Sequence, residues 1–239
     1  MYTIKTFESL SSTNQYVKDN YVSLPHKSVI VAKHQTAGRG RFNRLWQDEE
    51  GLNLLASILI KEDNFSYPVG QCSLAVALAV SKALDSYTRN LIKWPNDILI
   101  HNRKVAGILL EAISSNSLHA VIIGIGINVN QTLFPEELKS KTTSLAIETG
   151  HLLPLEPTLE SIITHFEVEY EALKRGAFAI GEYEARLTTI GQQVTYQGTS
   201  YIAKGVNPEG ALILEGLHKR IAITSGEVEH VSLYKTSQS

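Results

Sequence analysis

The sequence predicts an α+β fold, in which helices cover a mixed, mostly antiparallel sheet and a small β-barrel follows at the C-terminal end. Three observations lead to this prediction. Near-continuous apolar runs joined by short polar turns fill residues 90–130, a pattern typical of an antiparallel meander covered by helices. Residues 67–87 are rich in Ala and Leu, as expected of a buried helix. From Gly191 onward, five short β-type runs are separated by Gly and Asn-Pro turns, which is typical of a small barrel.

The expected elements of the first part follow from local patterns. Residues 11–20 should form a helix, because Ser and Thr hydroxyls at its start can satisfy free backbone N–H groups. The β-branched residues 27–35 and the apolar residues 53–60 each predict a strand. The helix expected at 67–87 has Pro68 near its start, where proline is tolerated.

The meander itself should contain a series of strands joined by the turns PND, NRK and SSNS. Their expected positions are 90–94, 98–101, 105–113 and 118–130. Charged and apolar residues then recur at helical spacing over 157–174 and roughly 177–190, which predicts two more helices. We therefore expect one domain over 1–190 and a second over 191–239. A barrel of that size has a thin core and should lean on the first domain.

Composition narrows the class of protein. The 239 residues include 22 Lys and Arg against 24 Asp and Glu, a formal net charge of −2, so no overall basic field draws the chain to nucleic acid or to an anionic membrane. The single Cys72 cannot form an internal disulfide and lies in an apolar run, as a buried thiol would. The N-terminus has no signal-peptide core, and the longest apolar run, 72–80, is too short to cross a bilayer. These features favour a cytoplasmic protein.

One loop stands apart from this composition. Residues 36–46 read TAGRGRFNRLW and hold three arginines, Arg39, Arg41 and Arg44. Gly38 and Gly40 allow close backbone approach to a ligand, and guanidinium groups fit phosphate or carboxylate oxygens. We expect this loop to be mobile when empty and to become ordered over an anionic ligand. A solvated surface loop is an equally good interpretation of these residues alone.

A second candidate region begins with the turn PND. It can push Asp97 to the sheet edge, where the carboxylate would hold Mg²⁺ beside a triphosphate, although such turns more often cap their own backbone. Lys104 opens the next strand on the face predicted for Ala106 and Ile108, either as a snorkelling side chain or as a cation aimed into a pocket. Gly107 would leave space for a ligand lying against the sheet.

Several familiar sites are excluded. The run GIGINVN at 124–130 has two glycines in an apolar strand but no G-x-G-x-x-G, and the chain has no P-loop motif. The eight histidines show no metal-ligand spacing, and no G-x-S-x-G elbow is present. Any ATP chemistry must therefore use another kind of site.

Taken together and in order, several segments resemble the biotin protein ligases, bacterial enzymes that attach biotin to acetyl-CoA carboxylase. The segments are STNQ at 12–15, QTAGRGR at 35–41, Trp46, KWPND at 93–97, RKVAGILLE at 103–111 and GIGINVN at 124–130. The resemblance covers nearly the whole chain. It implies a catalytic domain of the class II synthetase-like, biotin and lipoate ligase type, followed by a small SH3-like barrel.

The resemblance also implies a reaction. ATP and biotin are the substrates, with Mg²⁺, and they form biotinyl-5′-AMP and pyrophosphate. The ε-amine of one lysine on the biotin carboxyl carrier domain of acetyl-CoA carboxylase then displaces AMP. An edge strand of the sheet could pair with that carrier or with a second copy of the chain as a homodimer.

Carried over by position, Ser12, Thr13 and Gln35 would hydrogen-bond the ureido head of biotin. Arg41 and Lys104 would contact the biotin carboxylate and the α-phosphate, where two fixed cations stabilise charge developing at phosphorus. The expected catalytic residues are Arg41, Lys104 and Asp97, and Asp97 is also the expected metal ligand. The expected substrate-binding residues are Ser12, Thr13, Asn14, Gln35, Gly38, Arg39, Gly40, Arg41, Trp46, Asn96, Lys104, Gly107 and Asn128.

Other roles implied by the resemblance concern the walls of the pocket. Trp46 would pack over the ligand, Gly107 would make room along the apolar tail, and Arg39 would cover the ligand with its loop. Asn96 and Asn128 would lie near the nucleotide or the metal. The loop as a whole would act as a lid that keeps water from the mixed anhydride.

Alternatives remain at this stage. A lipoate-attaching enzyme shares the catalytic fold, and a non-catalytic sensor of biotin or nucleotide would keep it while losing Arg41, Asp97 or Lys104. Nucleic-acid binding through the arginines lacks interleaved aromatic residues. The segment SSTNQ begins at residue 11, which leaves no room for the helix-turn-helix domain of the repressor branch, so we expect a monofunctional ligase.

Overall fold

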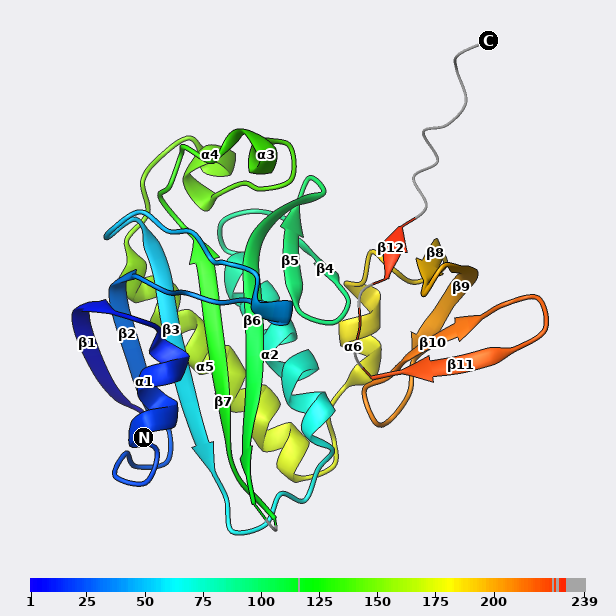
Figure 1. Cartoon of the computed structure of the whole chain (residues 1–239), viewed down its shortest axis with the longest axis horizontal. Coiled ribbons are helices and arrows are strands. Elements are labelled where there is room, and N and C mark those ends of the chain that lie inside the picture. Colours follow the sequence, from blue (N-terminus) through cyan, green and yellow to red (C-terminus); the bar gives the residue numbers. More distant parts are fainter. Residues whose placement is uncertain (116, 225, 227, 231–239) are drawn as a thin grey trace.

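The computed structural model describes residues 1–115, 117–224, 226 and 228–230. A seven-stranded sheet forms its centre, with two long helices on one face and a short helix on the other (Figure 1). A smaller sheet lies beside it at the C-terminal end. No helix within the described ranges combines the length and the apolar character needed to cross a lipid bilayer.

The central sheet has the strand order β1-β2-β3-β7-β6-β5-β4. Its strands are β1 (Thr3–Leu10), β2 (Ser28–Gln35), β3 (Asn53–Lys61), β4 (Leu91–Lys93), β5 (Asp97–Ile100), β6 (Arg103–Ser114) and β7 (Leu118–Asn128). Only β1 and β2 pair in parallel, and every other pairing in this sheet is antiparallel. The prediction of a mixed, mostly antiparallel sheet with a meander is confirmed. Strand β1 was not predicted, because its sequence TIKTFESL mixes polar and apolar residues on both faces and most of them stay exposed.

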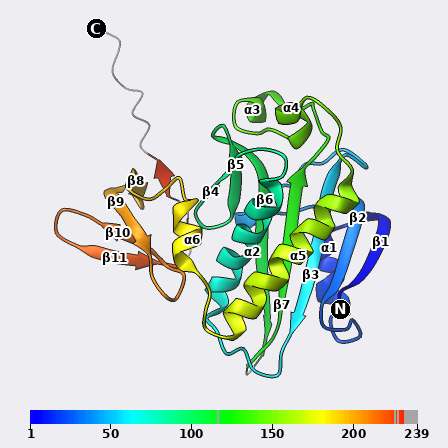
Figure 2. The same ribbon diagram turned by 180° about the vertical axis from the view of Figure 1, so that it is seen from behind.

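The helices are α1 (Thr13–Asn20), α2 (Val69–Leu84), α3 (Glu136–Lys139), α4 (Leu145–Thr149), α5 (Leu155–Lys174) and α6 (Ile180–Ala185). The Ser12 hydroxyl caps α1 by accepting the backbone N–H of Gln15, as expected. Seen from behind, α2 and α5 lie together across the sheet (Figure 2). The short helices α3 and α4 were not predicted, and α6 is shorter than the helix expected over 177–190.

Each face of the sheet carries its own buried cluster. On the face of α2 and α5, the apolar side of the strands packs into one continuous core. On the other face, Val17 of α1 packs on Ile30, Leu59 and Ile122. Cys72 belongs to the first core, where burial raises the pKa of its thiol to about 12. That thiol is a buried apolar group, as its sequence context indicated.

The C-terminal residues form a five-stranded antiparallel sheet with the order β11-β10-β9-β8-β12. Its strands are β8 (Gln193–Tyr196), β9 (Thr199–Val206), β10 (Leu212–Glu215), β11 (Arg220–Ile223) and β12 (Glu229–His230). Among the described residues, β11 and β12 do not pair with each other, so a closed barrel is not seen. The buried side chains of this sheet belong to the same apolar cluster as those beneath the main sheet, as expected of a small unit that leans on its neighbour. The domain boundary near residue 190 stays a prediction.

Candidate active site

A cavity of about 350 Å³ lies where several segments distant in the sequence meet on the main sheet. It is lined by the start of α1, the arginine loop, the β4–β5 turn, strands β6 and β7, residues near α3, and Gly226 and Val228. The predicted site residues that line it are Ser12, Thr13, Asn14, Gln35, Arg39, Gly40, Arg41, Trp46, Asn96, Asp97, Lys104, Gly107 and Asn128. The structure thus brings almost the whole predicted set together.

Gly38 is the predicted residue that does not line the cavity. A Cβ atom there would lie 2.9 Å from Nε2 of Gln35 and 3.1 Å from the carbonyl oxygen of Trp46. Its own carbonyl accepts the backbone N–H of Trp46 at 2.9 Å. Gly38 therefore contributes indirectly: without a side chain, it lets the loop pack closely on Gln35.

The arginine loop forms a small hairpin over the cavity. The N–H of Gly40 donates to the carbonyl of Arg44 at 2.8 Å, and Arg39 pairs with Leu45 in an antiparallel bridge. A 3₁₀ turn at Arg41–Asn43 closes it, with φ near +55° at Phe42 and Asn43. These two residues adopt the left-handed conformation that glycine adopts most easily. The expected ordering of this loop by a ligand stays a prediction.

Arg41 connects the loop to two other parts of the chain. Its guanidinium donates to Oδ1 of Asn96 at 3.1 Å and to the carbonyl of Gly226 at 3.0 Å, and it lies 5.1 Å from the centre of the Phe42 ring. Arg41 therefore joins the arginine loop to the β4–β5 turn and to Gly226, which follows β11 in the sequence.

The β4–β5 turn presents its polar side chains across the sheet. Asp97 Oδ1 lies 2.7 Å from Lys104 Nζ, and both side chains are about one-third exposed, 28% and 35%. The Asn96 amide donates to the carbonyl of Ile108. The bonds of this turn thus reach β6 and the arginine loop, in place of the self-capping that such turns more often show.

The face occupied by Lys104 corrects one prediction. Ile98 pairs with Ala106 but Leu99 pairs with Lys104, so Val105 is an extra residue on β6. Such a bulge shifts the alternation of side chains along the strand. Lys104 consequently faces away from Ala106 and toward Gly107, where its Nζ lies 2.9 Å from the position of a Cβ on that glycine. The bulge at Val105 turns Lys104 into the cavity, and a strict alternation of side chains along the strand does not predict it.

A buried polar network closes one end of the cavity. Gln35 Oε1 accepts the backbone N–H of Thr13 at 2.8 Å and lies 3.1 Å from its hydroxyl. Ser57 Oγ lies 2.7 Å from that hydroxyl and 2.6 Å from Oδ1 of Asn14. Nδ2 of Asn14 donates to Glu111 at 2.7 Å. Ser57 and Glu111 were not predicted; a lone polar residue inside an apolar strand was the signal that could have identified them.

The indole ring of Trp46 packs directly on the backbone of two glycines. Gly107 of β6 and Gly126 of β7 are paired directly across the sheet. A Cβ on Gly126 would lie 2.8 Å from the indole ring, and one on Gly107 would lie 3.2 Å from it. The space over Gly107 is therefore taken by this ring and by the end of Lys104. The role of Gly107 along a ligand tail stays a prediction.

Sequence reasoning also missed an apolar wall. Phe134, Pro135 and Leu138, around the start of α3, line the cavity together with Val228. Asn128, expected near the nucleotide, donates its amide to the carbonyl of Thr143 at 3.1 Å. The wall comes from a stretch whose short helix carries no strong sequence pattern.

Glu148 of α4 connects Thr143 to the β5–β6 turn. Its carboxylate accepts from Thr143 and Arg103 and lies 2.8 Å from Nδ1 of His101. Burial opposes its ionisation, but the hydrogen bonds from Thr143 and His101 and the charge of Arg103 outweigh burial and hold its pKa below the ordinary 4.5. The ionised form of Glu148 is thus part of the folded structure around Lys104.

The residues available for Mg²⁺ are few. Within the part of the chain that the structure describes, no cluster of three or more His, Cys, Asp or Glu side chains could hold a metal. Asp97, which lines the cavity, offers one carboxylate. A single carboxylate fits Mg²⁺ held mainly by phosphate oxygens and waters, since that ion commonly takes only one or two protein carboxylates.

Comparison with known proteins agrees with this geometry. The model of the biotin/lipoate A/B protein ligase family matches residues 6–128. A bifunctional ligase/repressor BirA of Bacillus subtilis is 34% identical over 238 residues, covering 95% of this chain and 70% of that protein. A biotin–[acetyl-CoA-carboxylase] ligase of Paracoccus denitrificans is 32% identical, covering 91% and 96%. A solved biotin protein ligase of Aquifex aeolicus, in complex with biotin and ATP, superimposes with a TM-score of 0.84 at 28% identity, covering 96% and 98%.

Proposed function

The chain belongs to the biotin/lipoate A/B protein ligase family, and we propose that it uses this cavity to join biotin to ATP and then to a lysine of a carrier protein. It is an ATP-dependent biotin protein ligase. The observation that carries the proposal is the polarity of the cavity: neutral polar side chains, Ser12, Thr13, Asn14 and Gln35, line one end, and the other end holds Arg41 and Lys104. Biotin has a neutral polar ring at one end and a carboxylate at the other.

The ureido ring of biotin lies at the buried end, where Ser12, Thr13 and Gln35 supply hydrogen-bond partners. A buried polar head requires such partners, because an unpaired group costs about 1–3 kcal/mol. Trp46 covers the apolar part of the ligand, and the tail runs over β6 and β7 toward the cations. The apolar wall around Phe134 is the best place for the adenine base, which needs an apolar surface.

The first step joins the two substrates. A carboxylate oxygen of biotin attacks the α-phosphorus of ATP, the bond to the bridging oxygen breaks, and pyrophosphate leaves. Arg41 and Lys104 stabilise the negative charge that develops on the α-phosphate, since fixed cations act most strongly on the transition state. Asp97 orients Lys104 through their ion pair. When bound, Mg²⁺ would be held by Asp97 and would neutralise phosphate charge.

The second step needs no nucleophile from the protein. The ε-amine of the carrier lysine attacks the carbonyl of the mixed anhydride, AMP leaves with its oxygen, and one proton passes to solvent. The protein holds the anhydride and excludes water under the arginine loop. The acceptor is the biotin carboxyl carrier domain of acetyl-CoA carboxylase. The C-terminal strands act as an SH3-like module that helps to position the loop through Gly226.

The test is direct. The full chain is incubated with labelled biotin, ATP, Mg²⁺ and a purified biotin carboxyl carrier domain, and label on the carrier is measured. Labelling that requires ATP and the carrier lysine supports the proposal, and its absence with active carrier would overturn it. A parallel arm replaces biotin by lipoate. Protection of the arginine loop from protease by biotin with ATP, but not by lipoate with ATP, separates the two ligand classes.

A further inference from the structure

We propose that Lys93 binds the pyrophosphate part of ATP and stabilises it as it leaves, so that Lys93 is a further catalytic residue of this site. Lys93 lines the cavity and lies in β4, the last strand of the main sheet. The proposal rests on the proposed function, because pyrophosphate leaves only if biotin and ATP react in this cavity.

Lys93 lies on the face of the sheet that carries the cavity. Its neighbour Ile92 is fully buried in the core beneath α2 and α5. Since successive side chains of a strand point to opposite faces, Lys93 points to the other face. The indole of Trp46 packs on Gly126, whose two neighbours in β7 belong to that same core. Lys93 and the indole are therefore on one face of the sheet.

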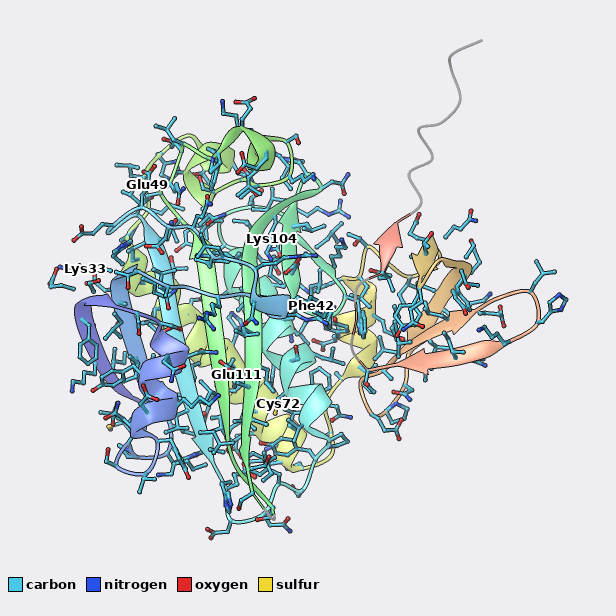
Figure 3. The ribbon with its side chains drawn as sticks, in the orientation of Figure 1. Lys33, Phe42, Glu49, Cys72, Lys104 and Glu111 are labelled. Carbon is cyan, nitrogen blue, oxygen red and sulfur yellow. The ribbon has the colours of Figure 1, made fainter. Side chains whose placement is uncertain are left out.

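A single row of directly paired residues connects Lys93 to the middle of the cavity. Lys93 pairs with Asp97, Asp97 with Gly107 and Gly107 with Gly126. Neighbouring strands lie about 5 Å apart, so Lys93 is one strand beyond Asp97 and about 10 Å beyond Gly107. Lys104, labelled on β6 in Figure 3, brings its Nζ to 2.7 Å from Asp97. The row therefore runs from the two glycines, past Lys104, to Lys93.

The direction of this row matches the direction in which the leaving group departs. The tail of biotin crosses the glycines, so its carboxylate reaches the α-phosphorus from the side of Gly107. In a displacement at phosphorus the attacking and leaving oxygens are roughly in line, so the bond that breaks lies on the far side, toward β4. The electron pair of that bond stays on the bridging oxygen and leaves with pyrophosphate, and no proton is transferred. The ammonium group of Lys93 stabilises the charge that develops there.

The charges of the site leave Lys93 available for an anion. The ammonium group of Lys104 is paired with the carboxylate of Asp97. For Lys93, no carboxylate oxygen among the residues that the structure describes lies within 4.0 Å of Nζ. Pyrophosphate can therefore pair with Lys93 without breaking an existing ion pair.

The backbone of β4 is held on both sides, which fixes the start of the lysine side chain. On one side β4 pairs with β5. On the other side the N–H of Ile92 donates to the carbonyl of Arg186 at 2.8 Å, and the carbonyl of Ile92 accepts the N–H of Thr188 at 2.9 Å. The carbonyl of Lys93 itself accepts the N–H of Asn96 at 3.2 Å. A cation on such a strand needs little rearrangement to act on the transition state.

The test compares Lys93→Gln with Lys93→Arg, which keeps the charge, and with Lys33→Gln. Lys33 of β2 pairs with Glu8 at 2.9 Å and does not line the cavity, so this control removes the same charge elsewhere. Two reactions of the full chain are measured with Mg²⁺ present. Biotin-dependent exchange of labelled pyrophosphate into ATP gives the KM values for pyrophosphate and biotin. Transfer of biotin from added biotinyl-AMP to the carrier measures a step in which pyrophosphate takes no part.

In Lys93→Gln we expect the KM for pyrophosphate to rise about 10- to 100-fold, as for one hydrogen bond to a charged group. The KM for biotin and the rate of transfer from added biotinyl-AMP should stay within about twofold of the parent. Lys93→Arg should recover most of the affinity for pyrophosphate, and Lys33→Gln should behave as the parent does. A purely structural role of Lys93 would instead impair both reactions alike.

An unchanged KM for pyrophosphate in Lys93→Gln, or an equal loss in the transfer from biotinyl-AMP, would overturn the proposal. If Lys93→Gln does not fold, the parent chain decides: pyrophosphate with Mg²⁺ must slow the acetylation of Lys93 by acetic anhydride, measured by mass spectrometry, more than that of Lys33. Equal protection of the two lysines, or none, would also overturn it. A parent chain with no biotin-dependent exchange would refute the proposed function, and the role of Lys93 with it, before any variant is compared.

Discussion

The two glycines beneath Trp46 give the sharpest test of the cavity, because one added methyl group has a different neighbour at each position. Gly107 and Gly126 are paired across β6 and β7. A methyl group on Gly126 would lie 2.8 Å from Cε2 and Cζ2 of the indole, a rigid ring. On Gly107 it would meet the end of Lys104 first, at 2.9 Å, and the indole only at 3.2 Å. A lysine end can move aside, whereas the ring must rise from the sheet.

The size of the effect of Gly126→Ala follows from that distance. To reach an ordinary contact at about 3.4 Å, the ring must rise by about 0.6 Å, and such a gap loses a quarter to a half of each dispersion contact beneath it. Removing a buried tryptophan side chain altogether costs about 3–5 kcal/mol, so a partial loss corresponds to about 1–2 kcal/mol. If the ring must be seated for the loop to close over biotin, the KM for biotin rises about 5- to 30-fold.

The assay is biotin-dependent pyrophosphate exchange, together with thermal unfolding. Gly107→Ala should raise the KM for biotin by no more than about threefold, because the group it displaces is flexible. Gly181→Ala in α6 is the matched control, since a Cβ there meets nothing within 4 Å, and it should slightly stabilise the helix. If Gly107→Ala weakened biotin binding as much as Gly126→Ala, or if neither had an effect, the indole would not be the part of the lid that covers the ligand.

Three further substitutions test the charged end and its support. Arg41→Gly removes the hydrogen bonds from the loop to Asn96 and Gly226, so we expect biotinyl-AMP to dissociate about 10- to 100-fold faster and to label lysines other than that of the carrier. Release of labelled adenylate measures this, and unchanged retention would contradict the role of the loop as a lid. Lys104→Ala removes a fixed cation and leaves Asp97 without its ion-pair partner, so pyrophosphate release should slow about 100-fold; an unchanged rate would exclude the assigned role. The lowered pKa of Glu148 contributes stability that is complete above about pH 4.5 and is lost as pH falls through its folded-state pKa. The melting temperature of Glu148→Gln should therefore fall less than that of the parent between about pH 5 and pH 3. An equal fall in both proteins would show that this carboxylate does not contribute to the acid sensitivity of the fold.

Most of the long helices and strands could be predicted from the sequence, because the spacing of apolar residues indicates which side chains are buried. The runs that became β3 and β7 are buried on both faces or nearly so, β6 is buried mainly at Val105, Ala106 and Ile108, and α2 is buried along most of its length. Strand β1 gave no such signal, since an exposed edge strand needs no alternation. The short helices α3 and α4 depend on packing around the cavity rather than on a pattern of their own.

Site residues were predictable where the residue type itself indicates the ligand, as the arginines of the loop indicate an anion and the aspartate of the PND turn indicates a metal ion. They were not predictable where the role depends on geometry. The bulge at Val105 redirects Lys104, and no local rule places an extra residue there. Ser57 and Glu111 both contact Asn14, so their place in the site follows from a contact between two strands and helix α1. Pairings of this kind are set by tertiary structure.

The two ends of the cavity differ in how they are held. At the biotin end, Thr13, Asn14 and Ser57 are buried and their side chains bond to one another. At the other end, Arg41 donates to Asn96 and to the backbone carbonyl of Gly226, which lies 185 residues away in the sequence. The first set of contacts joins helix α1 to the sheet beneath it, whereas the second joins the arginine loop to distant parts of the chain. We therefore expect a substitution that removes the Arg41 contacts to change the retention of the adenylate more than the binding of the biotin ring.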